Sequence, residues 1–217
     1  RRSGAPGDRR DRISTSKFGT ARPRATRYST SPERTRDRGV GDTMNELRNL
    51  VRDIPDFPKP GILYRDITPL LENPHGLRSA VQAMAEPFRG DSIDRVLGIE
   101  SRGFLFGVPI AIDLQAGFAA ARKPGKLPHD THRASYELEY GRDELHMHVD
   151  SIEAGQRVLL VDDLVATGGT AAAAVDLVGR AGGEVVGCAF LVELEDLKGA
   201  SRLEALGVER VHSVIVY

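Results

Sequence analysis

Residues 158–170 of this chain, VLLVDDLVATGGT, constrain its fold more than any other stretch. The first four are apolar without alternation, which predicts a strand buried on both faces, as in a parallel sheet. Asp162 and Asp163 come where this strand is expected to end, and ligands of open α/β sheets bind at the carboxyl ends of strands. We therefore expect these two carboxylates to lie in a ligand-binding site.

A short loop with two glycines follows the acids and leads into a helix. Apolar residues at positions 171, 174, 175 and 178 have the spacing of one helical face. The loop therefore precedes a first helical turn, where unpaired backbone amides bind phosphate, and Thr167 and Thr170 add hydroxyl groups. It contains no lysine, unlike the loop that binds nucleoside triphosphates. The pattern predicts a seat for one phosphate, next to carboxylates that suit the hydroxyls of a ribose 5-phosphate.

Strands and helices alternate along most of the chain. We expect strands at 96–99, 118–121, 158–161, 185–192 and 211–216, and helices near 47–51, 77–88, 104–114, after 170 and from 197. This alternation predicts the α/β class with a doubly wound, mostly parallel sheet. Residues 136–149 instead alternate with period 2 and predict an inserted antiparallel hairpin, which is a candidate lid.

Charge divides the 217 residues into two parts. Residues 1–43 hold 12 Lys and Arg against 5 Asp and Glu, which leaves 18 against 26 for residues 44–217. The first part is poor in aliphatic residues, so we expect it to be a disordered basic extension. A second interpretation is that the start of the chain is mis-assigned, because Met44 begins a helical pattern. The second part is long enough for one domain with a sizeable core.

Several other features exclude classes of protein. No apolar run reaches the roughly 20 residues of a membrane helix, and no secretory signal is seen, so we expect a cytoplasmic location without membrane or nucleic-acid partners. The single Cys188 lies in a predicted strand and is interpreted as a core residue. His146, His148 and Asp150 share one face of the predicted hairpin, which we interpret as a solvated face rather than a zinc site.

The run from Asp162 to Thr170 resembles the 5-phosphoribosyl 1-pyrophosphate (PRPP) motif of type I phosphoribosyltransferases. Four further segments are similar to the adenine phosphoribosyltransferase family and occur in the family's order: residues 56–69, 98–107, 122–128 and 135–141. The similarity covers essentially residues 44–217. Glu100 departs from the family, whose members often have Asp before Ser-Arg-Gly.

This resemblance implies a doubly wound sheet of the type I phosphoribosyltransferase kind and a purine-salvage reaction. Adenine and PRPP are the expected substrates, AMP and pyrophosphate the products, and a homodimer the expected assembly. The implied cofactor is Mg²⁺, held mainly through substrate and water rather than at a dedicated protein site. A phosphoribosyltransferase for another nucleobase and a PRPP-sensing regulator are the alternatives.

The resemblance also implies a role for each matching residue. Asp162 and Asp163 would hold the ribose hydroxyls, and Leu63 and Arg65 would line the adenine pocket. The PRPP and AMP contacts would come from Ala166, Thr167, Gly168, Gly169, Thr170, Ser101, Arg102, Arg122, Lys126 and Tyr140. Relatives often have a cis peptide bond in the loop at 98–103.

The chemistry needs stabilisation of opposite charges. Displacement of pyrophosphate by N9 of adenine builds positive charge on the sugar and negative charge on the leaving group, so carboxylates are expected on one side and cations on the other. Adenine loses a proton as the bond forms, and Glu139 in the predicted lid is our candidate for the accepting base. Glu137 lies on the same strand face and is the rival candidate.

Overall fold

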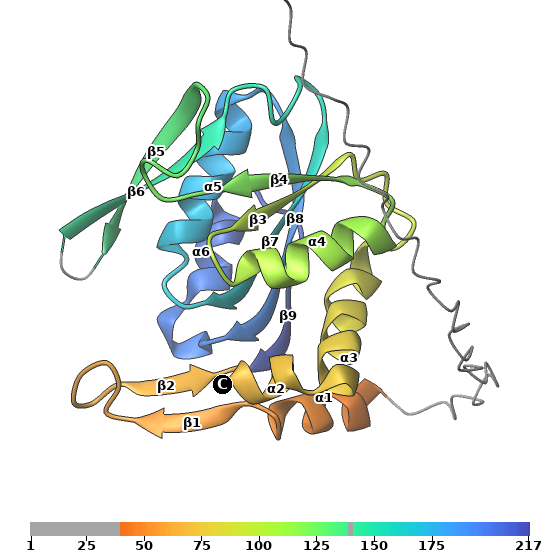
Figure 1. Cartoon of the computed structure of the whole chain (residues 1–217), viewed down its shortest axis with the longest axis vertical. Coiled ribbons are helices and arrows are strands. Elements are labelled where there is room, and N and C mark those ends of the chain that lie inside the picture. Colours follow the sequence, from red (N-terminus) through yellow and green to blue (C-terminus); the bar gives the residue numbers. More distant parts are fainter. Residues whose placement is uncertain (1–39, 139–140) are drawn as a thin grey trace, which may run out of the picture. The chain divides into compact units, whose positions relative to one another are not determined.

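The computed structural model describes residues 40–138 and 141–217, and the side chains of residues 43–136 and 143–217. Its centre is a five-stranded parallel sheet (Figure 1). In spatial order the strands are β4 (Gly117–Ala121), β3 (Arg95–Ile99), β7 (Arg157–Val165), β8 (Glu184–Glu193) and β9 (Val211–Val216). Chain order reverses between β3 and β7, so the sheet is doubly wound, as the sequence predicts.

The sheet has a hydrophobic core on each face because the middle of β7, from Val158 to Val161, is apolar at every position. Val158 and Leu160 of β7 face one core, and Leu159 and Val161 face the other. The first core is covered by α5 (Gly169–Arg180), α6 (Gly199–Ala205) and the predicted antiparallel hairpin. The helices over the second core are α1 (Val40–Arg48), α2 (Thr68–Glu72), α3 (Pro74–Ala85) and α4 (Gly103–Asp113).

The predicted antiparallel hairpin forms and stands apart from the main sheet. It pairs β5 (Thr131–Leu138) with β6 (Gly141–His148) and packs against α5 (Figure 1). The prediction that this face of the hairpin is solvated is wrong for His146. Its side chain is buried, and its Nε2 is hydrogen-bonded to Oε2 of Glu144 at 3.1 Å. Asp150 lies beyond the end of β6. Among the described residues no group of three potential ligands is placed to hold a metal ion.

A second hairpin, β1 (Arg52–Pro55) with β2 (Leu63–Asp66), is absent from the sequence prediction. The helix predicted near 47–51 lies earlier in the chain, because α1 ends at Arg48 and the chain then enters β1. Pro55 is the last residue of β1, and Pro58 and Pro60 lie in the turn between β1 and β2. This hairpin carries the segment in which Leu63 and Arg65 occur.

Two short 3-10 helices complete the described part of the chain, η1 (Glu86–Phe88) and η2 (Glu195–Leu197). Strand β7 is longer than the sequence predicts. It continues past Asp162 and Asp163 to Val165, because β8 continues to pair with it there. In the described part of the chain, none of the helices has the length and hydropathy needed to cross a lipid bilayer.

Candidate active site

The two acids of β7 lie in its carboxyl-terminal half, side by side. The backbone N–H of Asp163 donates to Oδ1 of Asp162 at 2.9 Å. Burial, followed by the charge of Asp163, raises the pKa of Asp162 well above its usual range. Burial also raises the pKa of Asp163, against the opposing effect of a neighbouring arginine. Such a pair favours positive charge in its surroundings.

Arg102, which follows β3, supplies that positive charge. Its Nε lies 2.7 Å from Oδ2 of Asp163, whose side chain is only 8% exposed. The guanidinium also donates to the hydroxyl of Tyr64 on β2. Burial opposes the charge of Arg102, but Asp163, Tyr64 and Asp162 together outweigh burial, and the pKa of the guanidinium is raised. Arg102 therefore joins three segments that are far apart in the sequence.

The loop at residues 98–103 packs directly against the acids. A Cβ on Gly103 would lie 2.7 Å from the carbonyl oxygen of Val161 and 2.9 Å from Oδ1 of Asp162, so no larger residue fits. The peptide bond between Glu100 and Ser101 is cis, as the resemblance implies. The structure thus brings Ser101 and Arg102 to the same strand ends as Asp162 and Asp163.

The expected phosphate loop, residues 166–170, begins three residues after Asp163. Gly168 has a left-handed backbone with φ of 73° and is the N-cap of α5, where it offers no side-chain hydrogen bond to the first helical amides. Thr167 is exposed and Thr170 is half-buried. The N-terminal amides of α5 therefore depend on a ligand or on water, which is the condition for anion binding.

The predicted cations Arg122 and Lys126 lie beside the 98–103 loop. Nε and Nη2 of Arg122 donate to the two carboxylate oxygens of Glu100 at 3.1 and 3.2 Å, and Nη1 donates to the backbone oxygen of Lys126 at 3.1 Å. Burial raises the pKa of Glu100, but bonds from Arg122 and from the Lys123 amide outweigh it and the pKa is lowered. Glu100 thus fixes Arg122, a contact that the sequence reading did not foresee.

Leu63 and Arg65, the predicted adenine contacts, occupy alternate positions on β2. The Arg65 side chain is already engaged: Nη1 lies 2.5 Å from Oδ1 of Asp53, and the guanidinium lies 3.7 Å from the ring centre of Tyr217. The Leu63 side chain, which is 46% exposed, and the backbone of β2 are then left to contact a base. Tyr64, between the two, contacts Arg102 and was missed by the sequence reading, which had no signal for a contact over 38 residues.

Glu139 and Tyr140, the predicted lid residues, lie outside the described residues, and so does the side chain of Glu137. Towards the turn of the hairpin, Lys123 Nζ is paired with Oδ2 of Asp143, which also accepts from the Tyr136 hydroxyl at 3.1 Å. This network joins the two strands of the hairpin to the chain that leads into it.

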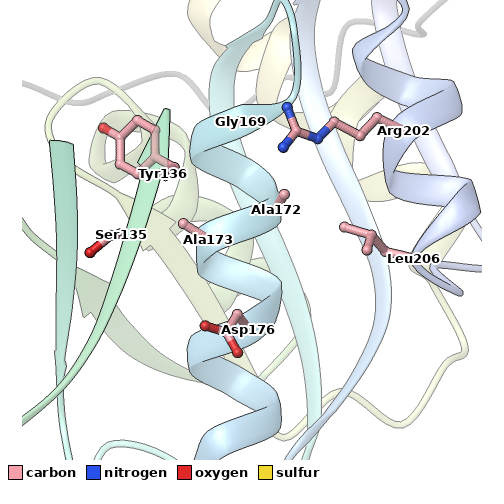
Figure 2. A pocket seen from close by; sticks show the side chains of 8 residues that line it. All are labelled: Ser135, Tyr136, Gly169, Ala172, Ala173, Asp176, Arg202 and Leu206. Atoms are coloured by element: carbon pink, nitrogen blue, oxygen red, sulfur yellow. The ribbon is translucent and has the colours of Figure 1, made fainter. Parts of the chain in front are cut away.

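A pocket of about 430 Å³ lies between the hairpin, α5 and α6 (Figure 2). It shares only Gly169 with the predicted site, and none of Asp162, Arg102 or Leu63 lines it. The pocket is therefore not the site predicted from the sequence. Its lining residues are Ser135, Tyr136, Gly169, Ala172, Ala173, Asp176, Arg202 and Leu206.

A parallel sheet with paired acids on β7, an open helix N-terminus and a neighbouring arginine suits a ribose 5-phosphate, and similar proteins place the chain in the class of phosphoribosyl-transferring enzymes. The family described as "Phosphoribosyl transferase domain" matches residues 67–211. The adenine phosphoribosyltransferase of Rhodopirellula baltica is 56% identical over 172 residues, which is 79% of this chain and 82% of that protein.

Solved structures give the same result. The adenine phosphoribosyltransferase of Rhodothermus marinus has a TM-score of 0.77 and 52% identity, covering 82% of this chain and 99% of that one. The Saccharomyces cerevisiae enzyme, solved with an imino-altritol bisphosphate and adenine, has a TM-score of 0.75 and 38% identity over 81% and 99% of the two chains. The chain belongs to the adenine phosphoribosyltransferase family, which makes AMP and pyrophosphate from adenine and PRPP in purine salvage.

Proposed function

We propose that the acids of β7, the loop at 98–103 and the loop at 166–170 together form the catalytic site for AMP synthesis. The contact of Arg102 with Asp163 carries this proposal, because it places a cation and two carboxylates at neighbouring strand ends. The N-terminal amides of α5 bind the 5-phosphate, and Asp162 and Asp163 accept hydrogen bonds from the ribose hydroxyls. Adenine binds against the backbone of Leu63 and Arg65.

The two acids lie on one side of the sugar, and the cationic residues that bind pyrophosphate lie on the other. As the bond to pyrophosphate breaks, positive charge on the ribose is stabilised by Asp162 and Asp163. Negative charge on pyrophosphate is stabilised by the backbone amide of Ser101 and by the side chains of Arg102, Arg122 and Lys126. Lys126 comes from the same subunit or from its partner. Arg102 exchanges its bond with Asp163 for one with the anion when PRPP enters.

The acid pair also suits Mg²⁺, because a hard cation takes carboxylate and water oxygens and would offset the burial and the charge of Asp163 that raise the pKa of Asp162. Asp162 and Asp163 would hold the ion, through its waters and the substrate's oxygens. When bound, it supplies charge neutralisation for pyrophosphate.

Glu139 is proposed as the group that accepts the N9 proton of adenine, with Glu137 as its rival. Glu139→Gln should lower turnover by ~10²-fold or more and leave PRPP affinity unchanged. Glu137→Gln, on the same strand, is the matched control. A larger loss of turnover in Glu137→Gln than in Glu139→Gln would transfer the role.

A homodimer is supported by the apolar side of α4 that the chain leaves uncovered. Leu105, Val108 and Ile112, spaced along one face, are 48%, 42% and 74% exposed. A second copy would bury them. Light scattering should show that Ile112→Glu produces monomers. Leu197→Glu, at an exposed aliphatic residue outside α4, should remain dimeric. A monomeric wild type would refute the homodimer.

AMP formation from adenine and PRPP with Mg²⁺ tests the activity, with guanine and xanthine as controls. Of the three bases, we expect only adenine to give a nucleotide product. PRPP binding without AMP would indicate the sensor instead, and activity with another base would indicate a different phosphoribosyltransferase.

A further inference from the structure

Helix α6 packs against the loop at 166–170, and backbone lies against backbone at this contact because both residues are glycines. A Cβ on Gly199, its first residue, would overlap the carbonyl oxygen of Ala166 and would lie 2.9 Å from the nitrogen of Gly168. The fit is reciprocal, since a Cβ on Gly168 would lie 2.8 Å from the carbonyl oxygen of Gly199. Two glycines, 31 positions apart in the sequence, thus allow one backbone to lie on the other.

A second contact comes from the same helix. Nη1 of Arg202 donates to the carbonyl oxygen of Thr167 at 3.4 Å. Helix α6 therefore contacts two successive carbonyl groups of the loop, that of Ala166 through Gly199 and that of Thr167 through Arg202.

These contacts determine where the loop's donors point. In a trans peptide the carbonyl and the following N–H point in opposite directions, and the peptides of this loop are trans. Because the carbonyls of Ala166 and Thr167 face α6, the N–H groups of Thr167 and Gly168 face away from it. They are directed to the side on which a phosphate can bind.

We propose that Gly199 and Arg202 are positioning residues that hold the loop in its phosphate-binding conformation. This inference rests on the proposed function of the loop. Neither residue touches the sugar phosphate; each acts through the peptide groups of Ala166, Thr167 and Gly168. An added methyl group at Gly199 would move the loop and misalign its amides.

The test compares Gly199→Ala with Gly179→Ala. Gly179 lies in α5, and a Cβ there would meet no atom within 4 Å. In steady-state assays, Gly199→Ala should raise KM for PRPP at least tenfold, leave KM for adenine within twofold, and weaken ribose 5-phosphate binding in calorimetry. Gly179→Ala should match the wild type in all three. An unchanged KM for PRPP in folded Gly199→Ala, or equal rises in both KM values, overturns the proposal.

Arg202→Met keeps the inference testable if Gly199→Ala does not fold. It should raise KM for PRPP about threefold and leave KM for adenine unchanged, and no change would contradict the role of Arg202. The proposed function fails separately: if the backbone amide signals of residues 167–170 in the wild type do not shift when ribose 5-phosphate is added, the loop is not a phosphate site. If they shift in the wild type and equally in Gly199→Ala, only the role of α6 is refuted.

Discussion

Asp66, at the end of β2, and Asp162, in β7, are carboxylates near an arginine, yet the protein treats them in opposite ways. Asp66 accepts hydrogen bonds from the Thr68 amide at 2.9 Å and from Arg52 at 2.6 and 3.0 Å, and bonds from Thr68 and then Arg52 lower its pKa to about 2. Burial and the charge of Asp163 raise the pKa of Asp162. A carboxylate that stabilises the fold accepts hydrogen bonds from groups of the protein, whereas a functional carboxylate keeps its capacity to accept them for a ligand.

The largest expected effect lies on the functional side of this contrast. Asp162→Asn and Asp163→Asn should each reduce kcat by ~10²- to 10³-fold, because each removes negative charge from the side of the sugar that becomes positive. Steady-state AMP formation measures the loss. Asp196→Asn, an exposed acid in η2, should retain full activity, and comparable activity in all three variants would remove the acids from the mechanism.

On the structural side, Asp66→Asn should lower the free energy of unfolding by about 1 to 2 kcal/mol at pH 7. The folded pKa of Asp66 lies below the ordinary 3.8, so its contribution is complete above about pH 4 and is lost as pH falls from 3.8 towards 2. Urea denaturation at several pH values should therefore show wild type and variant converging in acid. A difference that does not change with pH would mean that ionisation of Asp66 does not stabilise the fold.

Asp162→Asn should have the opposite sign and raise the free energy of unfolding by about 1 kcal/mol at pH 7, although it lowers kcat. An acid whose folded pKa is raised opposes folding when ionised, so the variant's advantage should be largest at high pH. It should disappear as pH falls below the ordinary value of 3.8. Thermal unfolding of the variant beside Asp66→Asn tests this directly, and a lower melting temperature for Asp162→Asn would break the comparison.

The two sides of the contrast also differ in how far the sequence predicts them. The β3 and β7 segments, with the loops and helices that follow, are continuous patterns of apolar, glycine and acidic residues, and the structure confirms them. Hairpin β1–β2 was missed, because four-residue strands with prolines carry little periodicity. The contacts of Arg102 with Tyr64 and Asp163, and of Gly199 with Gly168, join distant segments, and only tertiary packing creates them.

The smallest expected effect concerns Tyr217, which follows β9 and contacts Arg65 of β2. Its ring lies between the guanidinium groups of Arg48, at 4.4 Å, and Arg65, at 3.7 Å. An arginine over an aromatic ring contributes about 0.5 to 1 kcal/mol, so Tyr217→Ala should raise KM for adenine about two- to fivefold and leave KM for PRPP unchanged. Tyr217→Phe keeps the ring and should behave as the wild type. If Tyr217→Ala altered PRPP binding instead, β2 and the acid pair would be one coupled unit through Tyr64 and Arg102, and the separation between stabilising and functional carboxylates would not hold.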